Sequence, residues 1–192
     1  PKWKGRICIR SSGNIYNQSL VASMIATRGE ARTEEWARGL VANLARKPKG
    51  GDRDQIKAAA AGQCDIAVAN TYYMGKMLNS RKDDGQRAAG MKMQLVWPNQ
   101  DERGAHVNIS GAAVTKASKN LEAAVKLIEY LASAEAQQWY AESNYEYPVR
   151  SGVAVSKTLG AWGEFKADSI NLSRLGENNA AAVKLMDRAG WR

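Results

Sequence analysis

The sequence predicts an α/β fold in which a largely parallel sheet is flanked by helices. Short β-rich runs alternate with stretches whose apolar residues recur at helical spacing, a pattern typical of parallel α/β proteins. The chain has 192 residues, of which 44% are hydrophobic, so it is long enough to bury a core. Polar, turn-rich stretches at residues 98–104 and 143–152 interrupt the pattern and indicate crossings between two lobes.

The first half of the chain contains two predicted strands, each followed by a loop with helix-start chemistry. Thr33 is a candidate cap because Glu34 and Glu35 follow it in what would be the first helical turn. Asp52 is a second candidate cap, for a helix that stops at Gly62. In chain order, we expect a strand at 6–10, a helix from about Ile15, a helix after Thr33, a helix after Asp52, a strand at 64–69 and a helix from near Tyr72.

The second half adds two further predicted strands and three helices. A run at 93–97 is closed by Pro98, and another strand is expected at 106–114. Apolar residues at helical spacing follow Asn120, and a further helix contains Trp139 and Tyr140. The last helix is expected at about 177–189.

Composition limits the classes of function. The formal charge is +9 with a pI near 9.6, which suits a nucleic-acid binder, a partner for acidic surfaces or an anion receptor. The Lys and Arg residues are scattered, so a solvated surface is the simpler interpretation. The chain opens on Pro1 without a methionine, and we expect a fragment or a processed product.

Cysteine and histidine content excludes a zinc site of the Cys/His type. The chain has two cysteines and one histidine, too few for four such ligands. Cys8 and Cys64 lie near the starts of predicted strands, and they form either one disulfide or two buried thiols. His106 is expected to have an ordinary surface or hinge role. There is no GxSxG, P-loop or HExxH motif, and we expect the protein not to be an enzyme.

Three tyrosines follow the first two predicted strands at their carboxyl ends. Tyr16 comes after the first strand, and Tyr72 and Tyr73 come after the second. Ligands of open parallel sheets bind beyond the carboxyl ends of strands, so adjacent strands would bring the three phenols into one crevice. Phenolate is a hard, anionic oxygen donor that suits ferric iron. Packing of the rings is the alternative interpretation.

The loop after the first strand has the chemistry of an anion site. Ser12 offers a hydroxyl, Gly13 and Asn14 offer backbone amides, and Arg10 is a candidate counter-charge. A small anion such as carbonate, held there, could complete the coordination of Fe3+.

Five stretches of the sequence together resemble one family. They are RSSGNIYNQSLVA, IAVANTYYMGKM, WPNQDERGAHVNISGAAV, AEAQQWYAESNYEYPV and LMDRAGWR, and they span essentially the whole chain. In that order they are similar to the ferric-iron-binding periplasmic proteins of bacterial ABC importers. The resemblance implies a type II periplasmic-binding-protein fold, whose two lobes close over ferric iron.

That resemblance also implies a division of the chain and a set of ligands. Residues 1–99 and 151–192 would form the carboxyl-terminal lobe, and residues 100–150 would belong to an incomplete amino-terminal lobe. Tyr72 and Tyr73 match iron ligands of the family, and Tyr16 matches a third tyrosine of its tyrosine-rich subgroup. Ser12, Gly13 and Asn14 match the loop that holds a synergistic anion in some members.

The function implied is capture of Fe3+ and its delivery to an ABC importer permease in the periplasm. We expect a monomer whose partners are ferric iron, the permease and the missing amino-terminal lobe, and we expect no nucleic acid. Two alternatives stay open. One is a protein of the same fold that binds an oxyanion or another small ligand. The other is a basic nucleic-acid-binding module in which Tyr72 and Tyr73 stack on bases.

Overall fold

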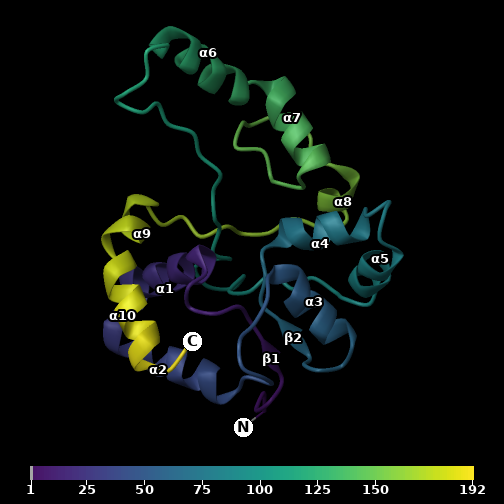
Figure 1. The fold of residues 1–192 in the computed structure, drawn as a ribbon, viewed down its shortest axis with the longest axis vertical. Helices are drawn as coiled ribbons and strands as arrows, with labels where there is room; N and C mark the ends of the chain where they lie inside the picture. Colours follow the sequence, from purple (N-terminus) through teal and green to yellow (C-terminus); the bar gives the residue numbers. More distant parts are fainter. Residues whose placement is uncertain (1) are drawn as a thin grey trace. The chain divides into compact units, whose positions relative to one another are not determined.

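The computed structural model describes residues 2–192, which form two compact units (Figure 1). The first unit consists of the chain as far as Asn108 together with Phe165–Arg192. The second unit is Ile109–Glu164. The lobe boundaries expected near residues 99 and 150 stay a prediction, because compactness alone does not define the lobes of a whole protein. Across residues 2–192, no helix has both the length and the apolar character that a membrane crossing requires.

The first unit contains both strands and most of the helices. Helices α1, α2, α9 and α10 pack against one another, and helices α3, α4 and α5 form a second group (Figure 1). Their bounds in chain order are β1 Ile7–Cys8, α1 Ile15–Arg28, α2 Glu30–Ala42, α3 Asp52–Ala60, β2 Ile66–Ala67, α4 Thr71–Leu78, α5 Asp84–Met91, α9 Ser173–Glu177 and α10 Asn179–Arg188.

The two strands pair in parallel, which confirms the parallel arrangement expected from the sequence. Ile7 is in register with Ile66, and Cys8 with Ala67. A disulfide joins Cys8 to Cys64 beside this pair, so the first of the two cysteine interpretations is correct. The strands and the disulfide therefore hold the two following loops at the same edge of the sheet.

The sheet is smaller than expected, because two predicted strands do not form. Within the described chain, residues 93–97 and 106–114 belong to no strand, and only a single bridge pairs Ala105 with Ala167. Val96 and Ile109 are 78% and 62% exposed, so neither run is covered by a neighbouring strand. A strand without a hydrogen-bonding neighbour gains no ladder, and its apolar residues alone do not fix it.

Three helix starts differ from the expected ones. Helix α2 begins at Glu30, and the Thr33 hydroxyl donates to the Gly29 carbonyl at 2.7 Å inside the first turn. Helix α3 begins at Asp52 itself, so Gly51 is its cap residue. The expected last helix is divided by Asn178 into α9 and α10. The first two helices thus begin a few residues from the expected positions, and the last one is replaced by two shorter helices.

The core of the first unit is built around the end of the chain. Trp191 is fully buried among residues of α1, α2 and α10, and its ring packs against Trp36 with centroids 6.4 Å apart. The indole Nε1 donates to the Arg10 carbonyl at 2.9 Å. The carboxyl-terminal tryptophan thus fixes the backbone immediately after β1.

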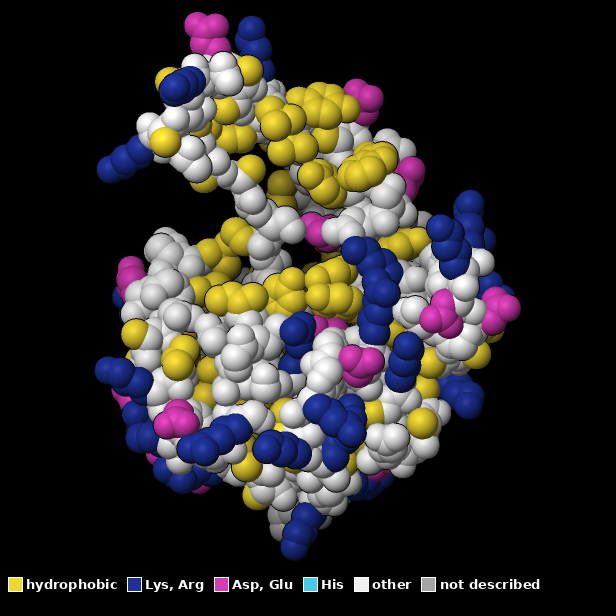
Figure 2. Space-filling view, in the orientation of Figure 1, with side chains coloured by type: hydrophobic (Ala, Val, Ile, Leu, Met, Phe, Trp, Pro, Cys, Tyr) yellow, Lys and Arg dark blue, Asp and Glu magenta, His cyan; other side chains and the backbone are white. Residues whose placement is uncertain are grey.

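The second unit consists of α6 Leu121–Leu131, α7 Ala134–Ser143 and α8 Lys157–Gly160. Helix α7 contains Trp139 and Tyr140 as expected, and the Ser133 hydroxyl caps it. Helix α6 follows Asn120 as expected, although the Asn120 side chain makes no capping hydrogen bond. Several apolar side chains of this unit are exposed (Figure 2): Leu121, Val125, Leu127, Tyr130 and Trp139.

Candidate metal centre

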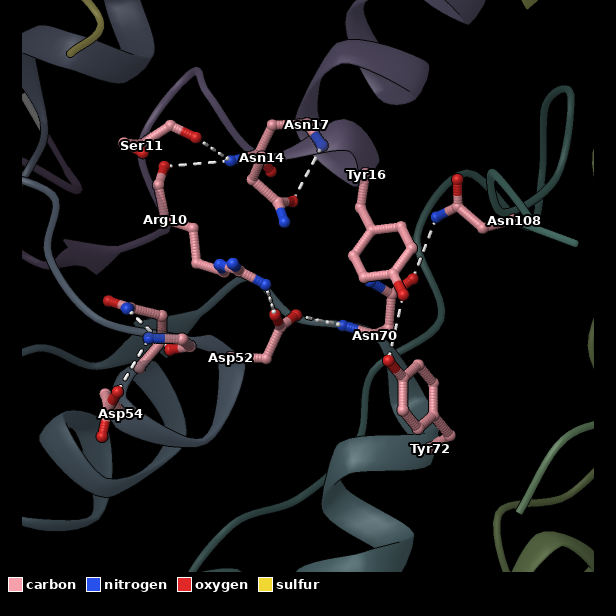
Figure 3. A network of polar contacts seen from close by, with 12 residues as sticks. Arg10, Ser11, Asn14, Tyr16, Asn17, Asp52, Asp54, Asn70, Tyr72 and Asn108 are labelled. Carbon is pink, nitrogen blue, oxygen red and sulfur yellow. Dashed lines mark hydrogen bonds and ion pairs between the residues drawn. The ribbon is translucent and has the colours of Figure 1, made fainter. Parts of the chain in front are cut away.

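The structure brings the three predicted tyrosines together. Tyr16 is in the first turn of α1, and Tyr72 and Tyr73 are in the first turn of α4. The hydroxyl oxygens of Tyr16 and Tyr72 face each other at 3.0 Å (Figure 3). The rings of Tyr72 and Tyr73 lie with their centroids 4.1 Å apart. The first turns of two helices therefore present one cluster of phenols, here called the tyrosine cluster: Tyr16, Tyr72 and Tyr73.

The local sequence explains why these helices begin where they do. The Asn14 side chain accepts a hydrogen bond from the Asn17 amide at 3.2 Å, which caps α1. The Asn17 side chain in turn donates to the carbonyls of Arg10 and Ser11, at 2.9 and 3.0 Å. Asn70 is the cap residue of α4; its side chain makes no capping hydrogen bond, but its amide donates to Asp52 Oδ1 at 3.0 Å. Each helix thus starts from a loop whose backbone is held in place.

The surroundings of Tyr72 favour its protonated form when no cation is bound. Burial raises the pKa of Tyr72, and its hydrogen bonds with Tyr16 and Tyr73 raise it further. Lys76, one turn along α4, places its ammonium 5.0 Å from the centre of the Tyr72 ring. A bound cation would reverse this preference, because it stabilises the anionic form of the ligand.

The predicted counter-charge, Arg10, is bound to a buried carboxylate. Its guanidinium donates to Asp52 Oδ2 at 2.6 Å, and the side chain of Asp52 is only 3% exposed. Burial lowers the pKa of Arg10, but the hydrogen bond and charge of Asp52, aided by Tyr73, raise it above its usual value. Arg10 is therefore a firmly charged group beside the tyrosine cluster.

Asp52 also binds the loop before α4. Its Oδ1 accepts a hydrogen bond from the Asn70 amide at 3.0 Å, and the Asn70 side chain accepts another from Asn108 at 2.9 Å (Figure 3). Sequence reasoning missed Asp52 as part of the site, because its position suggested only a helix cap. Nothing in the local pattern shows that this carboxylate faces two other loops.

The residues expected to hold an anion lie in the loop between β1 and α1. The Ser12 carbonyl accepts from the Gln18 side chain at 3.1 Å, and Gly13 is exposed. The Asn14 amide donates to the Ser11 carbonyl at 3.1 Å, and the Asn14 side chain caps α1. The Asn14 amide and side chain thus already have hydrogen-bond partners. Within the predicted anion loop, Ser12 and Gly13 are therefore better placed to bind an anion.

His106 has a more defined environment than a surface or hinge role implies. The side chain is half-buried, and its Nε2 lies 2.9 Å from the Ser19 hydroxyl on α1. Burial lowers its pKa to about 4, and the nearby charge of Arg103 acts in the same direction. The imidazole is therefore neutral at physiological pH.

Typical metal-ligating side chains are not grouped in the described part of the chain. Throughout residues 2–192, no three His, Cys, Asp or Glu side chains lie together so that they could hold a metal ion. The tyrosine cluster offers phenol oxygens instead, which as phenolates are hard donors that suit a trivalent cation better than a soft one.

The chain is similar to bacterial solute-binding and iron-binding proteins. A family model described as bacterial extracellular solute-binding protein matches residues 1–167. Iron uptake protein A1 of Synechocystis sp. is 50% identical over 192 residues, which is all of this chain and 53% of that protein. The major ferric iron-binding protein of Neisseria meningitidis is 28% identical over 192 residues and is covered to 55%. The chain spans about half the length of the curated relatives it matches.

Two solved structures share the fold. One is a Trichodesmium protein in complex with iron and citrate ligands, with a TM-score of 0.95 and 52% identity. The other is the ferric binding protein from Campylobacter jejuni, with a TM-score of 0.96 and 45% identity. Both similarities cover 100% of this chain and 60% of the matched chain.

Proposed function

Because the chain belongs to the family of bacterial extracellular solute-binding proteins, we propose that it binds ferric iron for an ABC importer. The fold expected from the sequence, that of a periplasmic binding protein, is confirmed by the solved structures it resembles. The single observation that carries the proposal is the 3.0 Å approach of the Tyr16 and Tyr72 hydroxyls, with Tyr73 beside them. The protein captures and delivers iron, and it catalyses no reaction.

The ligands in this proposal are the phenolate oxygens of Tyr16, Tyr72 and Tyr73. The hydrogen bond between Tyr16 and Tyr72 requires a proton, so iron replaces that proton as it binds. Three phenolates would neutralise the charge of Fe3+ without carboxylate or imidazole ligands. Iron is the cargo in this scheme and leaves the site unchanged.

An anion such as carbonate is proposed to complete the coordination. Ser12 and Gly13 lie in the loop that leads to Tyr16, with Asn14 holding the start of α1. Arg10 contributes positive charge, although its guanidinium is shared with Asp52. The anion would therefore be bound mainly through the hydroxyl and amides of the loop.

We propose that this chain functions together with protein segments beyond the residues of this sequence. The matched relatives are longer than this chain, and the second unit exposes Leu121, Val125 and Leu127 on α6. An exposed apolar helix face is usually covered in the mature assembly. We propose that an amino-terminal lobe covers it and adds ligands, that the whole protein is a periplasmic monomer, and that its partner is a permease.

The test is a titration with ferric citrate followed by visible absorption and metal analysis. The expected result is a phenolate-to-iron charge-transfer band in the wild-type chain, and loss of that band in the Tyr72→Phe/Tyr73→Phe variant. Tyr130→Phe is the matched control, because Tyr130 is 52% exposed in the other unit. A colourless wild-type protein, or an unchanged band in the double variant, would contradict the proposal. Calorimetry with phosphate and sulfate separates iron binding from oxyanion binding.

A further inference from the structure

Asp52 is a buried carboxylate that joins the two loops leading to the tyrosine cluster. Its Oδ2 accepts from Arg10, which precedes Tyr16, and its Oδ1 accepts from the amide of Asn70, which precedes Tyr72. Figure 3 shows the carboxylate between the two loops. One side chain on α3 thus connects the side chain of Arg10, after β1, with the backbone after β2.

This carboxylate is not needed to begin α3. The Gly51 amide, at the start of that helix, donates to Asp54 Oδ2 at 2.7 Å. Asp54 therefore already supplies the acidic side chain that α3 uses at its first turn. Burying a second charge costs several kcal/mol unless it is well paired, so the position of Asp52 calls for another explanation.

Both partners of Asp52 are themselves held on their far sides. The Arg10 carbonyl accepts from the buried Trp191 and from Asn17, each at 2.9 Å. The Asn70 side chain is bonded to Asn108 at 2.9 Å. Because both loops are anchored, a carboxylate that bonds to both of them fixes the distance between them. A contact with a mobile loop would not fix that distance.

We propose that Asp52 is the positioning residue of the tyrosine cluster. It sets the separation of Tyr16 and Tyr72 through Arg10 and Asn70, and it is not itself a ligand. The role in iron binding rests on the proposed function, but the effect of Asp52 on the Tyr16–Tyr72 contact can be measured without iron. Outer partners of metal ligands typically change metal affinity by about 10- to 100-fold when they are removed.

The test compares Asp52→Asn with Asp168→Asn. Asp168 forms a similar buried pair with Arg103 at 2.9 Å. Arg103 also donates to Ser23 and Thr27 in the later turns of α1, but in the described structure no hydrogen bond joins Asp168 or Arg103 to the loops that precede Tyr16 and Tyr72. Both variants lose one buried charge, so urea unfolding should show comparable losses of stability. Only Asp52→Asn is expected to weaken ferric iron binding at least tenfold in competition with citrate, and to shift the charge-transfer band.

A second measurement uses the iron-free protein. Selective 13C labelling of the tyrosine Cζ carbons reports on the Tyr16–Tyr72 hydrogen bond by NMR. Asp52→Asn is expected to move the signals of both residues, while Asp168→Asn leaves them in place. Unmoved signals in Asp52→Asn overturn the positioning role, whether or not the wild type binds iron. If Asp52→Asn shows the expected shifts but the wild type binds no iron, the proposed function alone is overturned.

If Asp52→Asn does not fold, the pair can be replaced as a whole. Arg10→Met/Asp52→Leu removes both charges together, which often preserves stability because no unpaired ion is left buried. The expected result is a folded chain whose tyrosine signals and iron affinity are both altered. A folded double variant with wild-type tyrosine signals contradicts the role of the pair.

Discussion

The hydroxyl oxygens of Tyr16 and Tyr72 lie 3.0 Å apart, although 56 positions separate the two residues in the chain. Each belongs to the first turn of a helix that follows a strand, the two strands are parallel neighbours, and a disulfide joins Cys8 of β1 to Cys64 just before β2. The contact is therefore a product of the fold and not of local sequence. At least one of the two hydroxyls donates its proton to the other, and a cation that binds both oxygens must displace that proton.

Iron binding is predicted to release protons and to strengthen as pH rises. The pKa of Tyr72 is raised by burial and by its phenol neighbours, so Tyr72 is protonated at neutral pH in the iron-free state. A higher pH lowers the cost of removing that proton, which favours the iron-bound state. Calorimetry of iron transfer from a chelator, in buffers of different ionisation enthalpy, measures the protons released. Binding that is independent of both buffer and pH, after correction for the chelator, would contradict the prediction.

Tyr16→Phe is predicted to weaken iron binding far more than it weakens the fold. Loss of one partly buried hydrogen bond costs about 1 kcal/mol of unfolding free energy. Loss of a phenolate ligand should lower iron affinity at least tenfold, and should weaken the charge-transfer band. Urea unfolding and citrate competition measure the two effects on the same protein. Tyr130→Phe should change neither, and equal iron affinity in Tyr16→Phe and Tyr130→Phe would remove Tyr16 from the ligand set.

The stability of the first unit is predicted to fall in mild acid because of His106. Its pKa is lowered to about 4 in the folded chain, against about 6.5 in the unfolded chain, so the unfolded state binds the extra proton first. The contribution of His106 is complete above pH 6.5 and is lost as pH falls towards 4, at about 1.4 kcal/mol per pH unit. Urea unfolding of wild type and His106→Gln between pH 7 and 4.5 measures this slope. The variant should show a shallower pH dependence, and identical slopes would exclude His106 as the cause.

Reduction of the Cys8–Cys64 disulfide is predicted to destabilise the chain. The bond joins residues 56 positions apart beside the β1–β2 pair, and both cysteines are buried. A closed loop of this length contributes about 4 kcal/mol in the chain-entropy model. Unfolding with and without a phosphine reductant measures the loss. Cys8→Ala/Cys64→Ala should be insensitive to the reductant, and a wild type that is equally insensitive would mean that the bond does not form in solution.

The meeting of Tyr16 with Tyr72 and Tyr73 could be anticipated only on the condition that their two strands are neighbours, because parallel strands end at one edge of a sheet. The pairing of Cys8 with Cys64 could be anticipated only as one of two alternatives, since spacing does not reveal which strands are neighbours. Both features depend on β1 and β2, whose short β-rich runs are visible in the sequence.

The role of Asp52 and the loss of two predicted strands could not be anticipated. Asp52 acts through Arg10 and Asn70, which lie 42 and 18 positions away, and no local pattern reports such contacts. The runs at 93–97 and 106–114 have strand composition, but strand formation also requires a neighbour with free backbone groups. His106 likewise looked unremarkable in sequence, because its burial depends on contacts with α1.

Resonance Raman spectroscopy of the iron-loaded chain, excited within its visible absorption band, tests most directly whether tyrosine phenolates hold ferric iron. The expected spectrum shows enhanced phenolate ring modes that shift when the tyrosines are ring-deuterated. These modes should disappear in the Tyr16→Phe/Tyr72→Phe/Tyr73→Phe variant and persist in Tyr130→Phe. An iron-loaded wild-type chain whose spectrum lacks tyrosine modes, or a triple variant that retains them, would contradict iron binding by the tyrosine cluster.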